Sequence, residues 1–308
     1  MIHFTQQTMQ TILTQLQNAL LKEESITFTI LNPDLHDTYA GNTVTIEGKC
    51  YLHRSYKAWL DLAELLMCKI LTPEKVTEHL VQLTFVKLGT DSFHTETKDS
   101  EKYGIQSHFS QIHKMEEPAF FFYYVQALKN VYIEKRKRVL NLGINRADEF
   151  EVIKNILDTN KYGNMNLVGI DHSKTAITYA KNVFPESNVT FYTHDINDLD
   201  VLQLGKFDLL ISIGTLQSPS INFKPFFMKL VQEYLEQDSA IILGFPNSRW
   251  VGGEMIYGAK APNYAMSEMS LLFNDVIFCK KYLQQKKYRV TITGKQYIFL
   301  TATKILSS

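Results

Sequence analysis

The sequence predicts an α/β fold, in which a doubly wound, mostly parallel sheet ends in an antiparallel hairpin and follows a small α+β domain. Three observations predict it. Strand-like and helix-like segments alternate from Arg138 onward, which is typical of a parallel sheet with helices on both faces. The apolar strand Val139–Leu142 breaks at Gly143 before an acidic helix start, and the next apolar strand ends on Asp171. The last two strands are separated by only two residues, too few for a crossover helix, so they must pair antiparallel.

Residues 1–90 are expected to form the small α+β domain, which we interpret as an accessory domain or substrate cap. Apolar residues at helical spacing predict an amphipathic helix over residues 4–23. The elements expected after it are strands at Ile26–Leu31 and Thr43–Tyr51, a helix at Ser55–Ile70 and a strand at Val81–Leu88.

Residues 91–135 are interpreted as a linker and a helical segment. The stretch Gly89–Lys102 is polar and rich in Thr, Ser, Asp and Glu, which is typical of a linker. After it, Gln106–Val131 is expected to be helical, with an interruption at Pro118.

The main α/β domain is assigned to residues 136–308. Its strands are expected at Val139–Leu142, Asn166–Ile170, Val189–Thr193, Phe207–Ile213, Ser239–Phe245, Tyr288–Thr293 and Gln296–Thr303. Its helices are expected at Asp148–Leu157, Ser173–Phe184, Phe223–Leu235 and Ser267–Gln285.

The composition narrows the class of protein. The 308 residues suggest about two domains. Lys+Arg and Asp+Glu balance at 32 each, so no global field favours nucleic acid or an anionic membrane. Three widely spaced cysteines (Cys50, Cys68, Cys279) suggest a reducing compartment, and no Cys/His cluster has zinc-site spacing. We find no signal peptide, and the most apolar segment is too short to span a bilayer, so we expect a soluble, cytoplasmic protein without a metal.

A strand, a glycine turn, a helix and a second strand that ends on an acid build a pocket for a cofactor that contains a nucleoside. The order of motifs narrows this further. Leu140-Asn141-Leu142-Gly143, Asp171, His194-Asp195-Ile196, the Phe207-Asp208 strand and the terminal hairpin together resemble the class I S-adenosylmethionine-dependent methyltransferases. The resemblance covers residues 136–303 and implies a seven-stranded sheet with S-adenosylmethionine as the cofactor.

The resemblance also implies roles for individual residues. The turn after the first strand, with Asn141, Gly143 and Asn145, corresponds to the glycine-rich motif that cradles the methionine part of the cofactor. In the same way Asp171 corresponds to the acid that binds both ribose hydroxyls. His172, the next residue, is expected either beside the adenosine or facing water. The remaining correspondences are Asp195 at the adenine amino group, Ile196 on the adenine ring, and Ile213 and Gly214 facing the transferred methyl group.

Three positions depart from the family pattern. Family members usually carry an acid where Asn141 stands and glycines where Asn145 and Ala147 stand. Asn145 can adopt the left-handed backbone that glycine favours, and Ala147 adds a single methyl group. The loss of the carboxylate at Asn141 removes a charge that favours the cationic end of the cofactor.

Substrate residues are expected beyond the carboxyl ends of the fourth and fifth strands. The long segment Asn247–Met266 is interpreted as a substrate loop hinged at Gly252 and Gly253, or else as a solvated connection. The candidate substrate residues are Gln217, Asn247, Arg249, Trp250 and Tyr257. Methyl transfer needs mainly alignment, so the sequence marks no catalytic residue. His108 and His113 are either surface histidines or a cover for the cofactor cleft.

These features favour a methyltransferase that acts on a small-molecule acceptor. Two alternatives stay open: an RNA- or protein-directed methyltransferase that uses residues 1–90 to bind the macromolecule, and a non-catalytic cofactor-binding module. Neutral charge and the absence of an NPPY-type motif after the fourth strand count against nucleic acid. A nicotinamide dehydrogenase is disfavoured, because the sequence lacks the dinucleotide-binding motif G-x-G-x-x-G and ends in an antiparallel hairpin. The protein could also form a homodimer.

Overall fold

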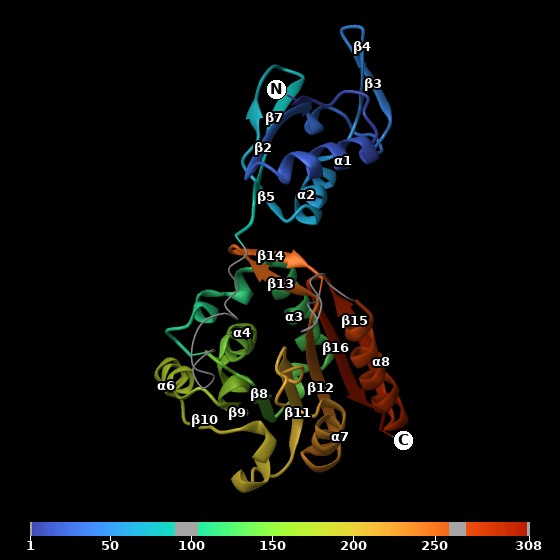
Figure 1. The fold of residues 1–308 in the computed structure, drawn as a ribbon. Coiled ribbons are helices and arrows are strands. Elements are labelled where there is room, and N and C mark those ends of the chain that lie inside the picture. The colour runs from blue at the N-terminus through green and yellow to red at the C-terminus, as the bar shows by residue number, and fades with distance from the viewer. Residues whose placement is uncertain (1, 90–103, 259–268, 307–308) are drawn as a thin grey trace. The chain divides into compact units, whose positions relative to one another are not determined.

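The chain divides into two compact units (Figure 1). The computed structural model describes residues 2–89, 104–258 and 269–306. The first unit comprises Met1–Ser92 and Trp250–Ile256, and the second comprises Phe93–Arg249 and Tyr257–Ser308. Most of the predicted linker, and the part of the predicted substrate loop from 259 to 266, lie outside the described residues.

The first unit is a small α+β fold with one mixed sheet and two helices. Its main strands follow the order β1 (Ile2–His3), β2 (Ser25–Leu31), β7 (Leu80–Lys87), β5 (Cys68–Ile70), and β6 (Glu74–Lys75) also pairs with β7. Helices α1 (Met9–Leu20) and α2 (Tyr56–Leu65) pack on this sheet through a core of Ile12, Leu16, Phe28, Trp59, Leu83 and Phe85.

Three boundaries in this unit differ from the prediction. Helix α1 begins only at Met9, because the Thr8 hydroxyl caps it by accepting a hydrogen bond from the Thr11 N–H. Helix α2 ends at Leu65, and Met67 has a φ of 56°, which turns the chain into strand β5. The predicted strand at 43–51 is a hairpin of β3 (Thr43–Ile46) and β4 (Lys49–Leu52).

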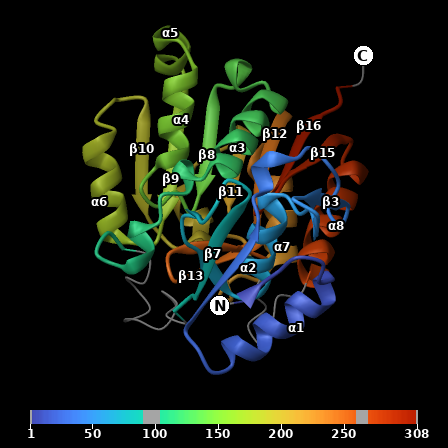
Figure 2. The ribbon, with the colours of Figure 1, turned by 90° about the horizontal axis from the view of Figure 1, so that it is seen from above.

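The second unit contains the predicted seven-stranded sheet. Figure 2 shows its strands in the order β10, β9, β8, β11, β12, β16, β15. The first five run parallel, whereas β16 pairs antiparallel with both β12 and β15, so the predicted terminal hairpin is confirmed. The bounds are β8 (Arg138–Leu142), β9 (Asn166–Asp171), β10 (Val189–Thr193), β11 (Phe207–Ile213), β12 (Leu235–Pro246), β15 (Tyr288–Gly294) and β16 (Tyr297–Lys304).

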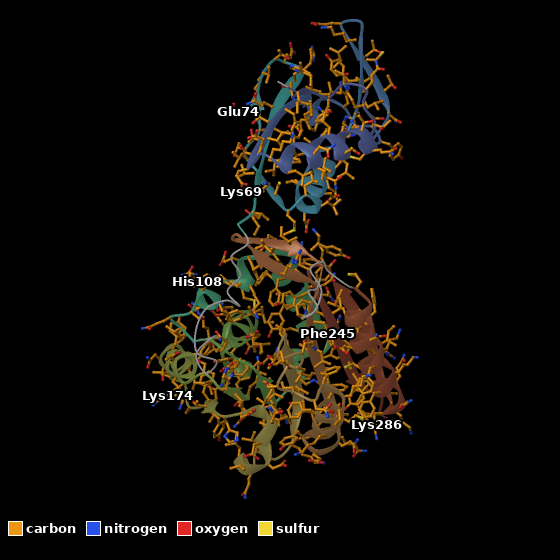
Figure 3. The ribbon with its side chains drawn as sticks, in the orientation of Figure 1. Lys69, Glu74, His108, Lys174, Phe245 and Lys286 are labelled. Carbon is orange, nitrogen blue, oxygen red and sulfur yellow. The ribbon has the colours of Figure 1, made fainter. Side chains whose placement is uncertain are left out.

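Helices cover both faces of this sheet, because side chains on its central strands alternate between two apolar cores. On β11, Leu209 and Ile211 belong to one core and Leu210 to the other. The first core is closed by α3 (Pro118–Asn130), α4 (Asp148–Ile156), α5 (Thr159–Gly163) and α6 (Lys174–Val183). The second is closed by α7 (Phe223–Glu233) and α8 (Met269–Gln285), and Phe245 of β12 lies in it (Figure 3). The predicted fold class is confirmed.

Two predictions for the second half of the chain are wrong in detail. The helix predicted over 106–131 begins only at Pro118, and two short 3-10 helices precede it, η3 (His108–Gln111) and η4 (Lys114–Glu116). The segment after Asn247 is not an irregular loop at its start, because β13 (Ser248–Val251) and β14 (Glu254–Tyr257) form a hairpin. Gly252 and Gly253 are its two-residue turn, with φ of 55° and 84°, and this conformation suits a tight hairpin rather than a hinge.

Candidate functional site

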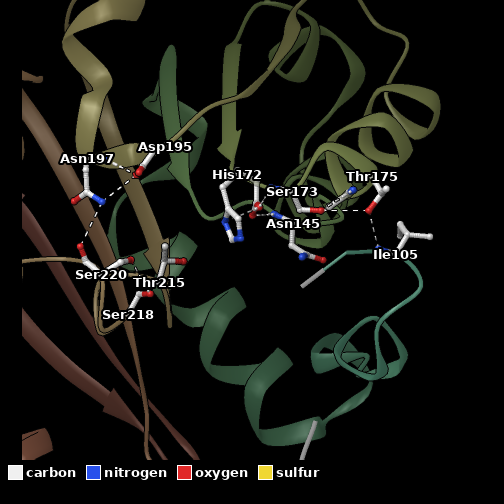
Figure 4. Close-up of polar contacts among 12 residues, drawn as sticks. Ile105, Asn145, His172, Ser173, Thr175, Asp195, Asn197, Thr215, Ser218 and Ser220 are labelled. Carbon is white, nitrogen blue, oxygen red and sulfur yellow. Dashed lines mark hydrogen bonds and ion pairs between the residues drawn. The ribbon is translucent and has the colours of Figure 1, made fainter. Parts of the chain in front are cut away.

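The site is built where β8, β9, β10 and β11 end. These four strands are parallel, so their carboxyl ends meet at one edge of the sheet. Gly143, Asp171, Asp195 and Gly214 follow or end the four strands at this edge. Figure 4 shows the polar contacts around them in two groups, one with Asn145, His172, Ser173 and Thr175, the other with Asp195, Asn197, Ser218 and Ser220.

The turn after β8 requires glycine at its first position. Gly143 has a φ of 75°, and its N–H donates to the carbonyl of Ile170 at 2.8 Å. A Cβ on Gly143 would lie 1.9 Å from the Thr215 hydroxyl oxygen, so a larger residue cannot be placed there without a shift. Asn145 and Ala147 have φ of 47° and 70°, the left-handed conformation that glycine favours. The turn is therefore retained without the two later glycines.

Asp171 ties this turn to the end of β9. One of its carboxylate oxygens accepts a hydrogen bond from the Asn145 N–H, and the other accepts from the Ser173 N–H, both at 2.9 Å. The side chain is nearly buried, and the half-exposed His172 ring lies beside it, with Nδ1 3.5 Å from a carboxylate oxygen. Each carboxylate oxygen has two lone pairs, so Asp171 retains acceptor capacity for two further donors.

The adenine side of the predicted site lies after β10. Asp195 is exposed, and its Oδ1 accepts hydrogen bonds from the backbone N–H and the side-chain amide of Asn197, at 2.9 and 3.0 Å. Ile196, which begins the 3-10 helix η6 (Ile196–Leu202), is buried in the core that α7 covers. Ile213 is buried at the end of β11, and Gly214 follows it with a φ of 72°.

Asn141, near the carboxyl end of β8, has a side-chain amide without a hydrogen-bond partner among the described residues. Its side chain is 1% exposed, and the atom without a partner is the amide nitrogen. A buried amide donor without a partner is costly. The orphaned amide at the end of β8 and the glycine-only turn beside it both fit a ligand bound at this edge, such as the methionine part of the predicted cofactor.

A second group of charged and aromatic residues was not predicted from the sequence. Lys114 of η4 places its ammonium 5.9 Å from the ring centres of Phe109, Phe120 and Tyr297. The Tyr297 hydroxyl in turn lies 3.7 Å from the point where a Cβ on Gly214 would stand. Lys114 and Tyr297 therefore belong to the edge at which β11 ends.

Glu149 lies in the first turn of α4 and is 6% exposed. Burial raises the pKa of its carboxyl group from 4.5 to about 7, an effect that Lys114 opposes and that Asp148 and Asp171 increase. Burial alone would lower the pKa of Lys114, but Tyr297, Glu149, Asp148 and Asp171 together raise it. Lys114 and Glu149 therefore affect each other's ionisation. The sequence showed Glu149 only as an acidic helix start and gave no signal for Lys114.

The candidate substrate residues differ in burial, in hydrogen bonding and in the unit to which they belong. Asn247 is 2% exposed and holds the turn before β16, because its N–H donates to Gln296 O at 2.8 Å and its side-chain amide to Lys295 O at 3.1 Å. The side-chain amide oxygens of Gln217, Asn247 and Gln296 are buried and have no hydrogen-bond partner in the described part of the chain.

The other candidates are Arg249 and Trp250 on β13 and Tyr257 on β14. Arg249 and Tyr257 belong to the second unit and Trp250 to the first, so the structure does not bring all five candidates together in one unit. His108 is exposed on η3, and His113 directly precedes η4 (Figure 3).

Two features are absent from the described residues. Within 2–89, 104–258 and 269–306, no three His, Cys, Asp or Glu side chains are arranged to hold a metal ion. In the same ranges, no helix combines the length and the apolar character that crossing a membrane requires.

The sheet order, the antiparallel last strand and the glycine turn facing Asp171 define a class I, Rossmann-like methyltransferase. Residues 133–292, more than half of the chain, match the family model described as a methyltransferase domain. The chain belongs to this family, and its cofactor is S-adenosylmethionine. No curated protein matches the sequence.

Solved structures with a similar fold share little sequence with this chain. The plantazolicin methyltransferase BpumL, solved with a monoazolic desmethyl analogue and SAH, is 12% identical, with a TM-score of 0.45 over 63% of this chain and 88% of its own. The small RNA methyltransferase HEN1 is 12% identical, with a TM-score of 0.46 over 75% of this chain and 29% of its own. The precorrin-6y C5,15-methyltransferase of Geobacter metallireducens GS-15 is 11% identical, with a TM-score of 0.41 over 59% and 87%. Identities this low say nothing about the methyl acceptor.

Proposed function

We propose that the protein transfers the methyl group of S-adenosylmethionine to a small, polar acceptor molecule. In this proposal residues 136–308 are the methyltransferase domain, residues 91–135 connect it, and residues 1–90 are an accessory domain that covers the acceptor. The observation that carries the proposal concerns three buried side-chain amide oxygens that have no hydrogen-bond partner within 2–89, 104–258 and 269–306. They belong to Gln217, Asn247 and Gln296, which follow β11, follow β12 and precede β16. Such acceptors suit a ligand that brings N–H or O–H donors.

Cofactor binding is assigned to the edge where β8 to β11 end. Asp171 accepts the ribose hydroxyls, with His172 beside the adenosine. Asp195 and Ile196 bind the adenine, whereas Ile213 and Gly214 face the transferred methyl group. The turn formed by Asn141, Gly143 and Asn145 receives the methionine part, which the orphaned Asn141 amide and the glycine-only position support.

The cofactor, when bound, supplies a methyl group already activated on a sulfonium sulfur, and the transfer is an in-line displacement. The residues of this chain therefore mainly align the acceptor and exclude water. Tyr297 lies at Gly214, next to the expected transfer point, and the Lys114 ammonium lies over its ring. This pair is placed to orient an acceptor through the phenol hydroxyl.

A small acceptor is favoured over RNA because positive and negative side chains balance at 32 each. The left-handed Asn145 and Ala147 keep the shape of the motif, which favours a working site over a degenerate module.

The test is a transfer assay with S-adenosylmethionine labelled on the methyl group. The purified protein is incubated with a whole-cell extract, and the label is counted in separated small-molecule, protein and RNA fractions. Label in the small-molecule fraction, lost with the Asp171→Ala variant, is the expected result. Label recovered in RNA or protein would support a macromolecular acceptor instead. Cofactor binding without transfer to any fraction would support the non-catalytic module.

A further inference from the structure

Arg54, in the first unit, is a buried positive charge without an acidic partner. The residue is 6% exposed, and within 2–89, 104–258 and 269–306 no carboxylate forms an ion pair with it. Burial lowers the pKa of its guanidinium group, and no neighbouring acid opposes this shift. A charge that is removed from water costs free energy unless an opposite charge and hydrogen bonds compensate it. In the protein alone this compensation is incomplete.

The guanidinium group of Arg54 lies between the starts of two helices. Its Nη2 donates a 2.6 Å hydrogen bond to the carbonyl of Gln7, which directly precedes Thr8, the N-cap of α1. Its Cζ lies 5.8 Å from the ring centre of Trp59, the fourth residue of α2. Arg54 itself directly precedes Ser55, the N-cap of α2. The side chain therefore packs on the first turn of α2 and reaches the start of α1.

Both helix starts add to the positive potential around Arg54. The N-terminal end of a helix carries roughly +0.5 elementary charge, which an acidic residue in the first turn can offset. Neither α1 nor α2 has an acidic residue in its first turn. The side chain of Ser55 makes no capping hydrogen bond, so it leaves the first N–H groups of α2 without a side-chain acceptor.

Other donors at this point also lack an acceptor. Trp59 is 2% exposed, and its indole N–H has no hydrogen-bond partner in the described part of the chain. The Nε and Nη1 atoms of Arg54 make no hydrogen bond to the described residues, yet they are not sealed from solvent. A guanidinium group has five N–H donors, so most of those on Arg54 remain free for a ligand.

We propose that the first unit binds an anionic group of a small molecule, a carboxylate or a phosphate, at Arg54 between the starts of α1 and α2. Such a group supplies the missing negative charge and accepts hydrogen bonds from the free guanidinium N–H groups. The uncapped N–H groups of α2 are further donors. The 6% exposure of Arg54 suits a terminal group better than the continuous backbone of a nucleic acid. The proposal is independent of the proposed function, because all its residues belong to the first unit.

Trp59 can report on this site when the other tryptophan is removed. The chain has two tryptophans, so Trp250→Phe in the full-length protein leaves Trp59 as the only indole fluorophore. This parent protein is titrated with inorganic phosphate and, separately, with acetate, while sodium chloride keeps the ionic strength constant. We expect a saturable change in Trp59 fluorescence. Saturation by phosphate alone identifies a phosphate ligand, and saturation by acetate alone identifies a carboxylate.

Thermal unfolding of the parent protein, followed by the same fluorescence, gives a second measurement. An anion that binds only the folded first unit stabilises it by mass action. At a concentration tenfold above its dissociation constant, the anion should raise the melting temperature of this unit by about 5 °C.

Arg54→Met, made in the parent protein, removes the charge and retains most of the volume of the side chain. It should weaken anion binding by at least about tenfold. Without anion its melting temperature should be equal to or higher than that of the parent, because an uncompensated buried charge is gone. Lys57→Met is the matched control, because Lys57 lies in the first turn of α2 with a side chain that is 77% exposed. This control should retain the response to the anion.

Absence of a saturable response to both anions in the parent protein, at concentrations up to tens of millimolar, would overturn the proposal, whether or not the Arg54 variant folds. Equal responses in Arg54→Met and the parent would also overturn it. A short RNA that displaces phosphate and binds at least about a hundredfold more tightly would overturn the assignment to a small molecule. None of these outcomes bears on the proposed function, which cofactor binding and methyl transfer test separately.

Discussion

The carboxylate of Asp171, at the end of β9, accepts a 2.9 Å hydrogen bond from the backbone N–H of Asn145 in the turn after β8. This bond crosses between two neighbouring parallel strands at the edge where the cofactor is expected to bind. The residue proposed to hold the ribose therefore also fixes the shape of the turn proposed to hold the methionine part.

Replacing Asp171 by Ala should weaken cofactor binding at least tenfold, because charge-assisted hydrogen bonds contribute about 1.5–3 kcal/mol each. The variant should also be less stable, since the N–H groups of Asn145 and Ser173 lose their acceptor. Calorimetric titration with S-adenosylhomocysteine and a thermal melt measure the two effects. Asp198→Ala, at an exposed site three residues after Asp195, is the control. Wild-type affinity in the Asp171 variant would show that the ribose assignment is wrong.

Gly143→Ala should destabilise the protein and remove cofactor binding. The new Cβ would lie 1.9 Å from the Thr215 hydroxyl oxygen, at a φ of 75°. Gly48 has the same φ of 75° with nothing within 4 Å of its Cβ position, so Gly48→Ala carries the backbone cost, about 1 kcal/mol, without the clash. Chemical denaturation compares the two variants.

The double variant Gly143→Ala, Thr215→Gly tests the steric cause of this effect. Removing the Thr215 side chain should restore part of the lost stability but not the cost of the left-handed backbone. If Gly143→Ala and Gly48→Ala lose the same stability, the close contact with Thr215 has no energetic weight.

Glu149→Gln should change how stability depends on pH. Burial raises the pKa of Glu149 from 4.5 to about 7, so between these values the folded protein retains a proton that the unfolded chain has released. The free energy of unfolding contributed by this group is therefore highest at low pH and falls as pH rises through this window. The glutamine variant has no ionisable group at this position and does not lose this stability. Its free energy of unfolding relative to that of the wild type should therefore increase by roughly 3 kcal/mol from pH 4.5 to 7 and stay constant above pH 7.

Urea unfolding of both proteins at several pH values measures this difference. Glu151→Gln, on the exposed side of the same helix, should show no such trend. A constant difference between the Glu149 variant and the wild type across the window would mean that Glu149 ionises normally in the folded protein.

Removal of residues 1–90 should leave cofactor binding and abolish turnover. The second unit has its own two apolar cores and contains every residue assigned to the cofactor. Titration with S-adenosylhomocysteine and the labelled-methyl assay, with the full chain as the control, measure the two properties. A fully active truncated protein would contradict a role for these residues in covering the acceptor.

The sheet of the second unit was predictable because its signals are local. Five apolar runs alternate with helical segments, and a two-residue connection forces the last pair of strands to be antiparallel. The β13–β14 hairpin also had a local signal, because two glycines between strand-like segments favour a tight turn. We interpreted Gly252 and Gly253 as a hinge instead, and that interpretation was wrong. The end of α2 had none, because the chain turns there at Met67, which has a positive φ although it is not a residue type that favours this conformation.

The residues proposed to bind the cofactor follow or end the strands, and their positions in the chain were likewise enough to propose them. The group of Lys114, Glu149 and Tyr297 was not, because these residues come from three elements that only the folded chain brings near one another. Burial decides the acidity of Glu149, and burial of one side chain in a helix start cannot be read from spacing alone.

The two units are interwoven along the chain, because Trp250–Ile256 lies in the first unit while the residues on both sides of it lie in the second. The backbone therefore passes from one unit to the other three times. An exchange of the first unit between related enzymes would have to transplant two separate stretches of sequence, and a graft of residues 1–92 alone would leave the host with a hairpin tip that belongs to its former neighbour.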